Sequence, residues 1–290
     1  MQNNIQFRSV RDFGEVINDT FQFVKQNLKP LLKTFFYFCG LFLIGGALAN
    51  ITAQLNMNSA IQAGTPKSAV TLANLFSVPM IFSFIFSVLT YVAVVLSILA
   101  YVTLYVEKGR ISPTIDEVWG YFKYYFVRVL FSTLFIGVIL TVSLFFLIIP
   151  FIYIFPAMSL LLPVMVIENA TFSYSFGKSF KILKGQWWVT AGTLLILWII
   201  TYALLTVVAL PGVVLGMTDQ FVPQTTAAKP ALIVFQSILT YLSQVFMVIP
   251  VVGISLIYFN LVERQENLGL FDRIDELGNT GHKTNISEEY

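Results

Sequence analysis

Three lysines and several large aromatic residues lie close together in the segment 168–188, ENATFSYSFGKSFKILKGQWW. After Glu168 this segment contains no acid and no histidine, while Lys178, Lys181 and Lys184 follow one another at three-residue spacing. Lysine ammonium groups beside apolar side chains can bind lipid phosphate or anchor a helix at a membrane surface. General acid–base catalysis needs a positioned acid or base, so we do not interpret the segment as a catalytic loop.

The apolar residues of this segment recur every three to four positions, which places them on one face of a helix. The lysines point elsewhere, so we predict a helix that lies on the membrane with Trp187 and Trp188 in the interfacial aromatic belt. Two alternatives use the same lysines and tryptophans. One is a specific lipid-headgroup site, and the other is a face that binds a partner protein.

Three glutamates each follow the end of an apolar block: Glu107, Glu168 and Glu263. A carboxylate at the C-terminus of a helix opposes the helix dipole, so each is expected to have a cationic partner. We hypothesise that these glutamates form ion pairs with basic residues of neighbouring amphipathic helices, among them Lys25 and Lys123. The alternative roles for the glutamates are proton coupling and catalysis.

A few amides lie within the apolar blocks, and Gln236 and Gln244 are eight residues apart on one helical face. We expect interhelical hydrogen bonds from them and from Asn260. The alternative is a polar patch lining a cavity.

Catalytic and metal-binding motifs are missing from the sequence. The single histidine is His282, near the C-terminus, and the single cysteine is Cys39. No HExxH motif, Cys/His cluster or Gly-rich phosphate loop occurs, and no block contains paired carboxylates. We therefore predict a protein that is not an enzyme and that holds no metal and no cofactor.

The apolar blocks themselves define the fold class. Of the 290 residues, 57% are hydrophobic and only 11% are charged, and the apolar residues form six blocks of bilayer-spanning length. The predicted spans are 31–53, 77–106, 129–149, 150–167, 188–210 and 231–262. We predict an all-α six-helix transmembrane bundle as one domain over 1–277, followed by a disordered tail over 278–290.

The third and fourth blocks form a short hairpin with an uncharged bend, FLIIPFIYIFP, where Pro150 and Pro156 are expected to break the helix. The hairpin either just reaches the far interface, with Tyr153 at headgroup depth, or is re-entrant.

Basic residues are distributed unevenly between the two sides of this topology. One side holds 15 of the 17 lysines and arginines, and the other holds only Lys67 and Lys229. By the positive-inside rule both termini are cytoplasmic, and we predict a multi-pass protein of a bacterial inner membrane. The net charge of +2 is too small to indicate nucleic acid binding.

Three segments of the chain are similar in pattern: 20–33, 118–131 and 176–189. They align Lys25, Lys123 and Lys181, and each precedes a span. We therefore predict amphipathic cytoplasmic helices before spans 1, 3 and 5, in three repeats related by pseudo-threefold symmetry. A chance match of short segments is the alternative.

A family resemblance rests on Glu168, Ala170, Phe176–Ser179, Leu183, Lys184-Gly185 and Trp188. This pattern resembles the signature of a broad group of bacterial six-span proteins. The group includes the membrane domain found with glycerophosphoryl diester phosphodiesterases. The start of the chain and the segment 263–278 are similar to members from Bacteroidetes-type bacteria. The resemblance implies a six-helix fold in the inner membrane, but no catalysis, because the hydrolase of the two-domain proteins is a separate soluble barrel.

The function that follows is a non-enzymatic inner-membrane scaffold or accessory subunit that binds lipid or a partner membrane protein. The alternative is a permease-like transport component for a lipid or small molecule. A continuous polar-lined cavity near Gln236, Gln244 and Asn260 would favour transport. A lipid enzyme that works through unusual residues is a third option.

Overall fold

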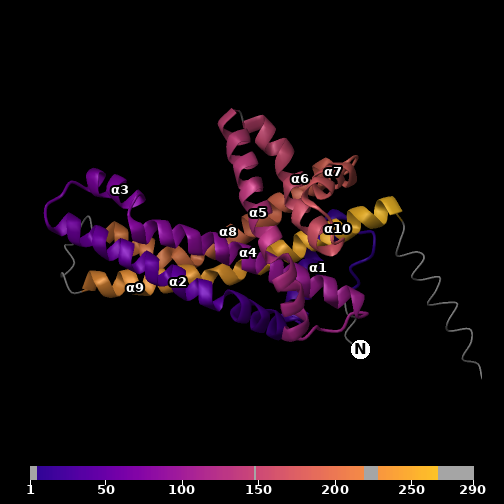
Figure 1. Ribbon diagram of the computed structural model, residues 1–290, viewed down its shortest axis with the longest axis horizontal. Helices are drawn as coiled ribbons and strands as arrows, with labels where there is room; N and C mark the ends of the chain where they lie inside the picture. Colours follow the sequence, from indigo (N-terminus) through magenta and orange to yellow (C-terminus); the bar gives the residue numbers. More distant parts are fainter. Residues whose placement is uncertain (1–4, 147, 219–227, 267–290) are drawn as a thin grey trace, which may run out of the picture.

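The computed structural model describes residues 5–146, 148–218 and 228–266, and this part of the chain is all-α (Figure 1). Six helical segments are long and apolar enough to cross a membrane, judged by length and composition. They are α2 (Leu28–Gln62), α4 (Val78–Glu107), α5 (Ile115–Phe146), α6 (Ile148–Ile167), α8 (Trp187–Thr218) and the composite of α9 (Ala228–Leu242), η1 (Ser243–Met247) and α10 (Val248–Glu266). The predicted all-α fold with six long apolar helices is confirmed.

Four of these segments form an elongated bundle, in which α2 lies against α4 and α9, and α8 lies against α9 and α10 (Figure 1). Helix α3 (Lys67–Leu75) lies at the left end in this view. The short helices α1 (Phe13–Gln26) and α7 (Phe172–Leu183) lie toward the opposite end. The segment 54–76 between the first two predicted spans is therefore largely helical, since α2 continues to Gln62 and α3 follows.

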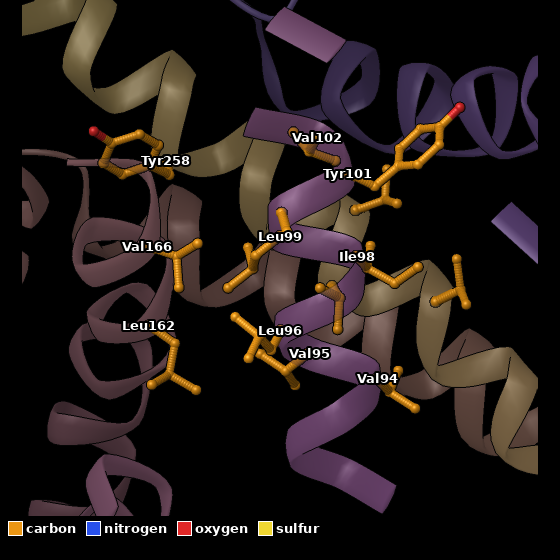
Figure 2. Packing of buried hydrophobic residues seen from close by; sticks show 14 of the residues in the cluster. Val94, Val95, Leu96, Ile98, Leu99, Tyr101, Val102, Leu162, Val166 and Tyr258 are labelled. Carbon is orange, nitrogen blue, oxygen red and sulfur yellow. The ribbon is translucent and has the colours of Figure 1, made fainter. Parts of the chain in front are cut away.

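The core is centred on α4, which is buried almost continuously from Val92 to Val102. Figure 2 shows Val95 and Leu99 of α4 projecting toward α6, where Leu162 and Val166 project back. A helix that is apolar on all sides, as α4 is, belongs in the interior.

The first helix is separate from the first span, in the position expected for it. Asp12 and Glu15 form a capping box that starts α1, because the Asp12 carboxylate accepts from Glu15 N and the Glu15 carboxylate accepts from Asp12 N, both at 2.8 Å. Its buried face, with Val16, Thr20 and Phe23, packs mainly against α10.

The segment expected as a separate helix before the third span is the first part of α5. That helix runs from Ile115 to Phe146 without a break. No glycine or proline lies at the predicted boundary near residue 128, so nothing in the local sequence ends the helix there. The third short helix, α7, is separate from α8. Gly185 adopts φ +80 after the end of α7, and this left-handed conformation interrupts the helical path before α8 begins.

At the α5–α6 hairpin, a proline expected to break the helix lies within it. The predicted break at Pro156 is wrong, because α6 continues through both Pro156 and Pro163. Each proline removes one helical hydrogen bond, and neighbouring helices can stabilise such a helix within a membrane protein.

The α5–α6 hairpin is not parallel to the long bundle. In Figure 1, α5 and α6 rise away from the long bundle. Tyr153, six residues into α6, stacks on Trp187 with ring centroids 5.9 Å apart, and its carbonyl accepts from Trp187 Nε1 at 3.1 Å. Trp187 is the first residue of α8, so Tyr153 lies where α8 begins and not at the far end of the bundle. The choice between a crossing and a re-entrant hairpin stays a prediction.

The last apolar segment is interrupted by a 3₁₀ turn just before a proline. The 3₁₀ turn Ser243–Met247 separates α9 from α10, just before Pro250. Pro250 has no N–H to donate to the carbonyl of Phe246, so the regular helical pattern is lost in the preceding turn. The predicted tail 278–290, including His282, lies outside the described residues.

Candidate functional site

A sharp corner between α6 and α7 brings a carboxylate, a lysine and polar residues of α10 together. Asn169 adopts φ +50, and the Thr171 hydroxyl accepts from Tyr174 N to start α7. Helix α7 then runs back along α6 and also contacts α10. The corner therefore places the end of α6 beside the first turns of α7.

Glu168 is the acceptor at the centre of this corner. Lys178 Nζ of α7 lies 2.9 Å from Glu168 Oε1, and the Tyr258 hydroxyl of α10 donates to the same oxygen at 2.5 Å. The Lys178 and Glu168 side chains are only 15% and 19% exposed, so solvent screens the pair weakly. One carboxylate thus joins α6, α7 and α10.

A hollow of about 360 Å³ lies on the outer side of this ion pair. Ser173, Tyr174, Lys178 and Lys181 of α7 line it, together with Gln265 of α10. Gln265 Nε2 donates to the carbonyls of Lys181 and Ile182 at 3.2 and 3.1 Å, which holds the end of α10 on the end of α7. The hollow offers hydroxyl, amide and ammonium groups, the donors that bind phosphate oxygens.

The remaining residues of the predicted interface lie along the chain beyond this hollow. Lys184 is exposed at the C-cap of α7. Trp187 is half-buried against Tyr153, whereas Trp188 is 82% exposed. Of the three predicted lysines, Lys178 and Lys181 therefore share a site, and Lys184 does not line it.

The other two glutamates have different surroundings. Glu107 accepts from the Tyr121 hydroxyl at 3.1 and 3.2 Å, so its described partner is a tyrosine of α5 and not a lysine. Glu263 is buried near the end of α10. Lys25 is exposed in the last turn of α1, and Lys123 Nζ lies 5.5 Å from the Trp119 ring centroid. Aligned positions in the three segments thus have different contacts.

The amides proposed as a polar patch do not lie together in a pocket. Asn260 Oδ1 accepts from Arg11 N at 2.9 Å, and Asn260 Nδ2 donates to Arg11 O at 3.2 Å, so this side chain ties the N-terminal segment to α10. Gln236 packs closely against Gly212 of α8. Gln244 lies in the 3₁₀ turn. None of the three lines the hollow at α7 or the cavity described below.

Two buried polar residues at this end of the molecule escaped the sequence analysis. Arg11 is 5% exposed and pairs with Asp19 at 2.7 Å, while its guanidinium also donates to the carbonyls of Gln6, Phe7 and Ser9. Asn27 Oδ1 accepts from the hydroxyls of Tyr101 and Ser112. The Arg11 guanidinium has partners within eight residues, but Asn27 lies 74 and 85 residues from its partners, so no local spacing marks the Asn27 contacts.

Comparison with known proteins gave no match to a protein-family model, a curated protein or a solved structure.

Proposed function

We propose that this protein is a non-enzymatic scaffold or accessory subunit of a bacterial inner membrane that binds anionic lipid headgroups at α7. The supporting observation is the hollow beside the Glu168–Lys178 ion pair, with Lys181 exposed at its edge. The exposed ring of Trp188, five residues beyond the last turn of α7, is of the type that anchors proteins at headgroup depth.

Charge at the hollow supports an anionic ligand. Glu168 neutralises Lys178, so Lys181 contributes the remaining positive charge among the charged residues of the site. Ser173 and Tyr174 add hydroxyl groups that can donate to phosphate oxygens. A lysine near an anionic leaflet contributes about 1 kcal/mol, which corresponds to roughly a fivefold change in affinity.

The structure separates two roles for neighbouring lysines. Lys178 is held by Glu168 and stabilises the corner, while Lys181 faces solvent at the hollow and is available to a headgroup. Lys184 has similar exposure but lies outside the hollow, which makes it a matched control.

The test measures binding of phosphatidylglycerol to the purified full chain in detergent by native mass spectrometry, with phosphatidylcholine as the neutral comparison. Lys181→Gln is expected to weaken phosphatidylglycerol binding about fivefold and to leave phosphatidylcholine binding unchanged. Lys184→Gln should have a clearly smaller effect. Equal losses from both variants would mean that the hollow has no special role, and no loss from either would refute headgroup binding at α7.

Transport, the alternative function, has less support. It requires a polar-lined cavity at Gln236, Gln244 and Asn260, whereas Asn260 is engaged with Arg11 and Gln236 packs on Gly212. A partner membrane protein remains compatible with the scaffold proposal, and the broad apolar surface of α5 provides room for one.

A further inference from the structure

A second cavity lies in the middle of the apolar region, separate from the hollow at α7. It has a volume of about 200 Å³ and is lined by residues of α4, α5, α6, α8, η1 and α10. Its wall is mainly aliphatic and aromatic, with Leu99, Leu140, Met158, Leu162 and Ile254 among the lining residues. Leu99 and Leu162 appear in Figure 2 on facing sides of α4 and α6.

Two polar groups in this wall have no hydrogen-bond partner among the described residues. Thr133 of α5 and Trp198 of α8 both line the cavity. Thr133 Oγ1 and Trp198 Nε1 are buried and make no hydrogen bond to any described residue. An unsatisfied donor in an apolar region is costly, so a bound group that pairs with both would be favoured.

The Thr133 hydroxyl makes no hydrogen bond within its own helix. Helical threonines such as Thr90, Thr103 and Thr201 donate to the carbonyl four residues earlier, each at 2.8 Å. Thr133 does not make the corresponding bond to Val129. Its hydroxyl is therefore free to pair with a ligand in the cavity that it lines.

The cavity has the size for a ring or a short aliphatic segment, and it is not closed, so the rest of a longer molecule can extend out of it. An apolar cavity of roughly 150 Å³ in another protein stays dry and binds benzene. The Trp198 indole is a donor only, and the Thr133 hydroxyl can also donate, so the complementary atom is an acceptor. A carbonyl oxygen has two lone pairs and can accept from both.

We propose that this cavity binds a lipid-soluble carbonyl compound, whose oxygen accepts a hydrogen bond from Trp198 Nε1, from Thr133 Oγ1 or from both, while its apolar body packs against the aliphatic wall. A quinone-type ring and the ester of an acyl lipid share this chemistry. The site is independent of headgroup binding at α7, so either proposal can fail alone.

The variants follow from the cavity wall. Gly137 lines the cavity and has no atom within 4 Å of its Cβ position, so Gly137→Leu adds a large side chain at the cavity wall without a clash at Cβ. Gly40 of α2 is equally open and lies outside the cavity, so Gly40→Leu is the matched control. A double variant, Thr133→Val with Trp198→Phe, keeps the shape of the wall and removes both donors.

The probe is 4-heptylbenzophenone, a lipophilic ketone that forms a covalent adduct with nearby C–H bonds under near-ultraviolet light. The full chain is labelled in detergent, and the adducts are mapped by mass spectrometry. We expect adducts on cavity residues such as Met158, at least fivefold less labelling in Gly137→Leu, and labelling like the wild type in Gly40→Leu. The double variant should need about fivefold more probe for half-maximal labelling.

Competition identifies the source of the natural carbonyl. A short-chain quinone or a diacyl phospholipid that displaces the probe supports the proposal and indicates which class binds. Cavity labelling that persists in Gly137→Leu would overturn it. Equal competition by the matching hydrocarbon, 1,1-diphenylethylene, would also overturn the proposal. That compound lacks the carbonyl oxygen, so equal competition would mean that the two donors add nothing to the affinity.

Discussion

Individual carboxylates are expected to contribute differently to the stability of this protein, because their exposure to solvent differs. Glu168 accepts both the Lys178 ammonium and the Tyr258 hydroxyl in a poorly exposed corner. The Lys108–Glu117 pair is also short, at 2.8 Å, but both side chains are more than 30% exposed. Breaking a poorly exposed pair leaves a charge without its partner, whereas exposed pairs contribute little to stability.

At the residue scale we predict that Glu168→Gln lowers stability by about 1–3 kcal/mol, because it removes the charge from an acceptor that joins three helices. The measurement is the thermal unfolding midpoint of the purified protein in detergent. Lys108→Gln serves as the control and should leave the midpoint close to that of the wild type. Equal midpoints for Glu168→Gln and the wild type would show that the corner does not depend on this carboxylate.

At the scale of elements, the apolar blocks predict the long helices well because a charge-free run of bilayer length has few alternatives. Details set by contacts are harder to predict. The α5 boundary near residue 128 carries no local stop signal, and the Asn260–Arg11 hydrogen bonds join residues 249 positions apart. The unpaired state of Thr133 depends on its neighbours across the cavity and has no signature in the sequence.

Helix α10 approaches α8 and α1 closely at Gly253. A Cβ there would lie 2.4 Å from Leu197 Cδ1 and 3.3 Å from Thr20 Oγ1. Leu197 and Thr20 are both fully buried, so neither has free space to move into. The glycine in α10 therefore allows three helices to pack together.

We predict that Gly253→Ala destabilises the protein by about 1–3 kcal/mol through overpacking, measured as a lower thermal unfolding midpoint in detergent. Gly40→Ala is the control, since no atom lies within 4 Å of its Cβ position. That change should stabilise α2 by up to about 1 kcal/mol, because alanine is the better helix former. A neutral or stabilising Gly253→Ala would contradict the close packing of α10.

At the scale of the whole molecule, the direction of the α5–α6 hairpin decides how the protein sits in a membrane. Only about 8 Å of helix separates Tyr153 from the start of α6, whereas a bilayer core is about 30 Å thick. Because Tyr153 stacks on Trp187 at the start of α8, the hairpin tip lies nearer that end of the bundle than the end where α3 lies (Figure 1). The exposed apolar side chains of α5, including Phe131 and Phe145, would then contact lipid within one leaflet.

Cross-linking can distinguish this arrangement from a hairpin that crosses the bilayer. In a Cys39→Ala background, the pair Tyr153→Cys with Trp187→Cys should be joined within one chain by a short bismaleimide, because the two native rings are 5.9 Å apart. The control pair is Tyr153→Cys with Lys67→Cys, where Lys67 begins α3 at the other end of the bundle (Figure 1). A crossing hairpin would reverse the outcome, because Tyr153 would then lie near the face that holds Lys67, about 30 Å from Trp187. Peptide mapping of cross-linked protein from native membranes therefore gives opposite products for the two arrangements, and we expect the Tyr153–Trp187 product.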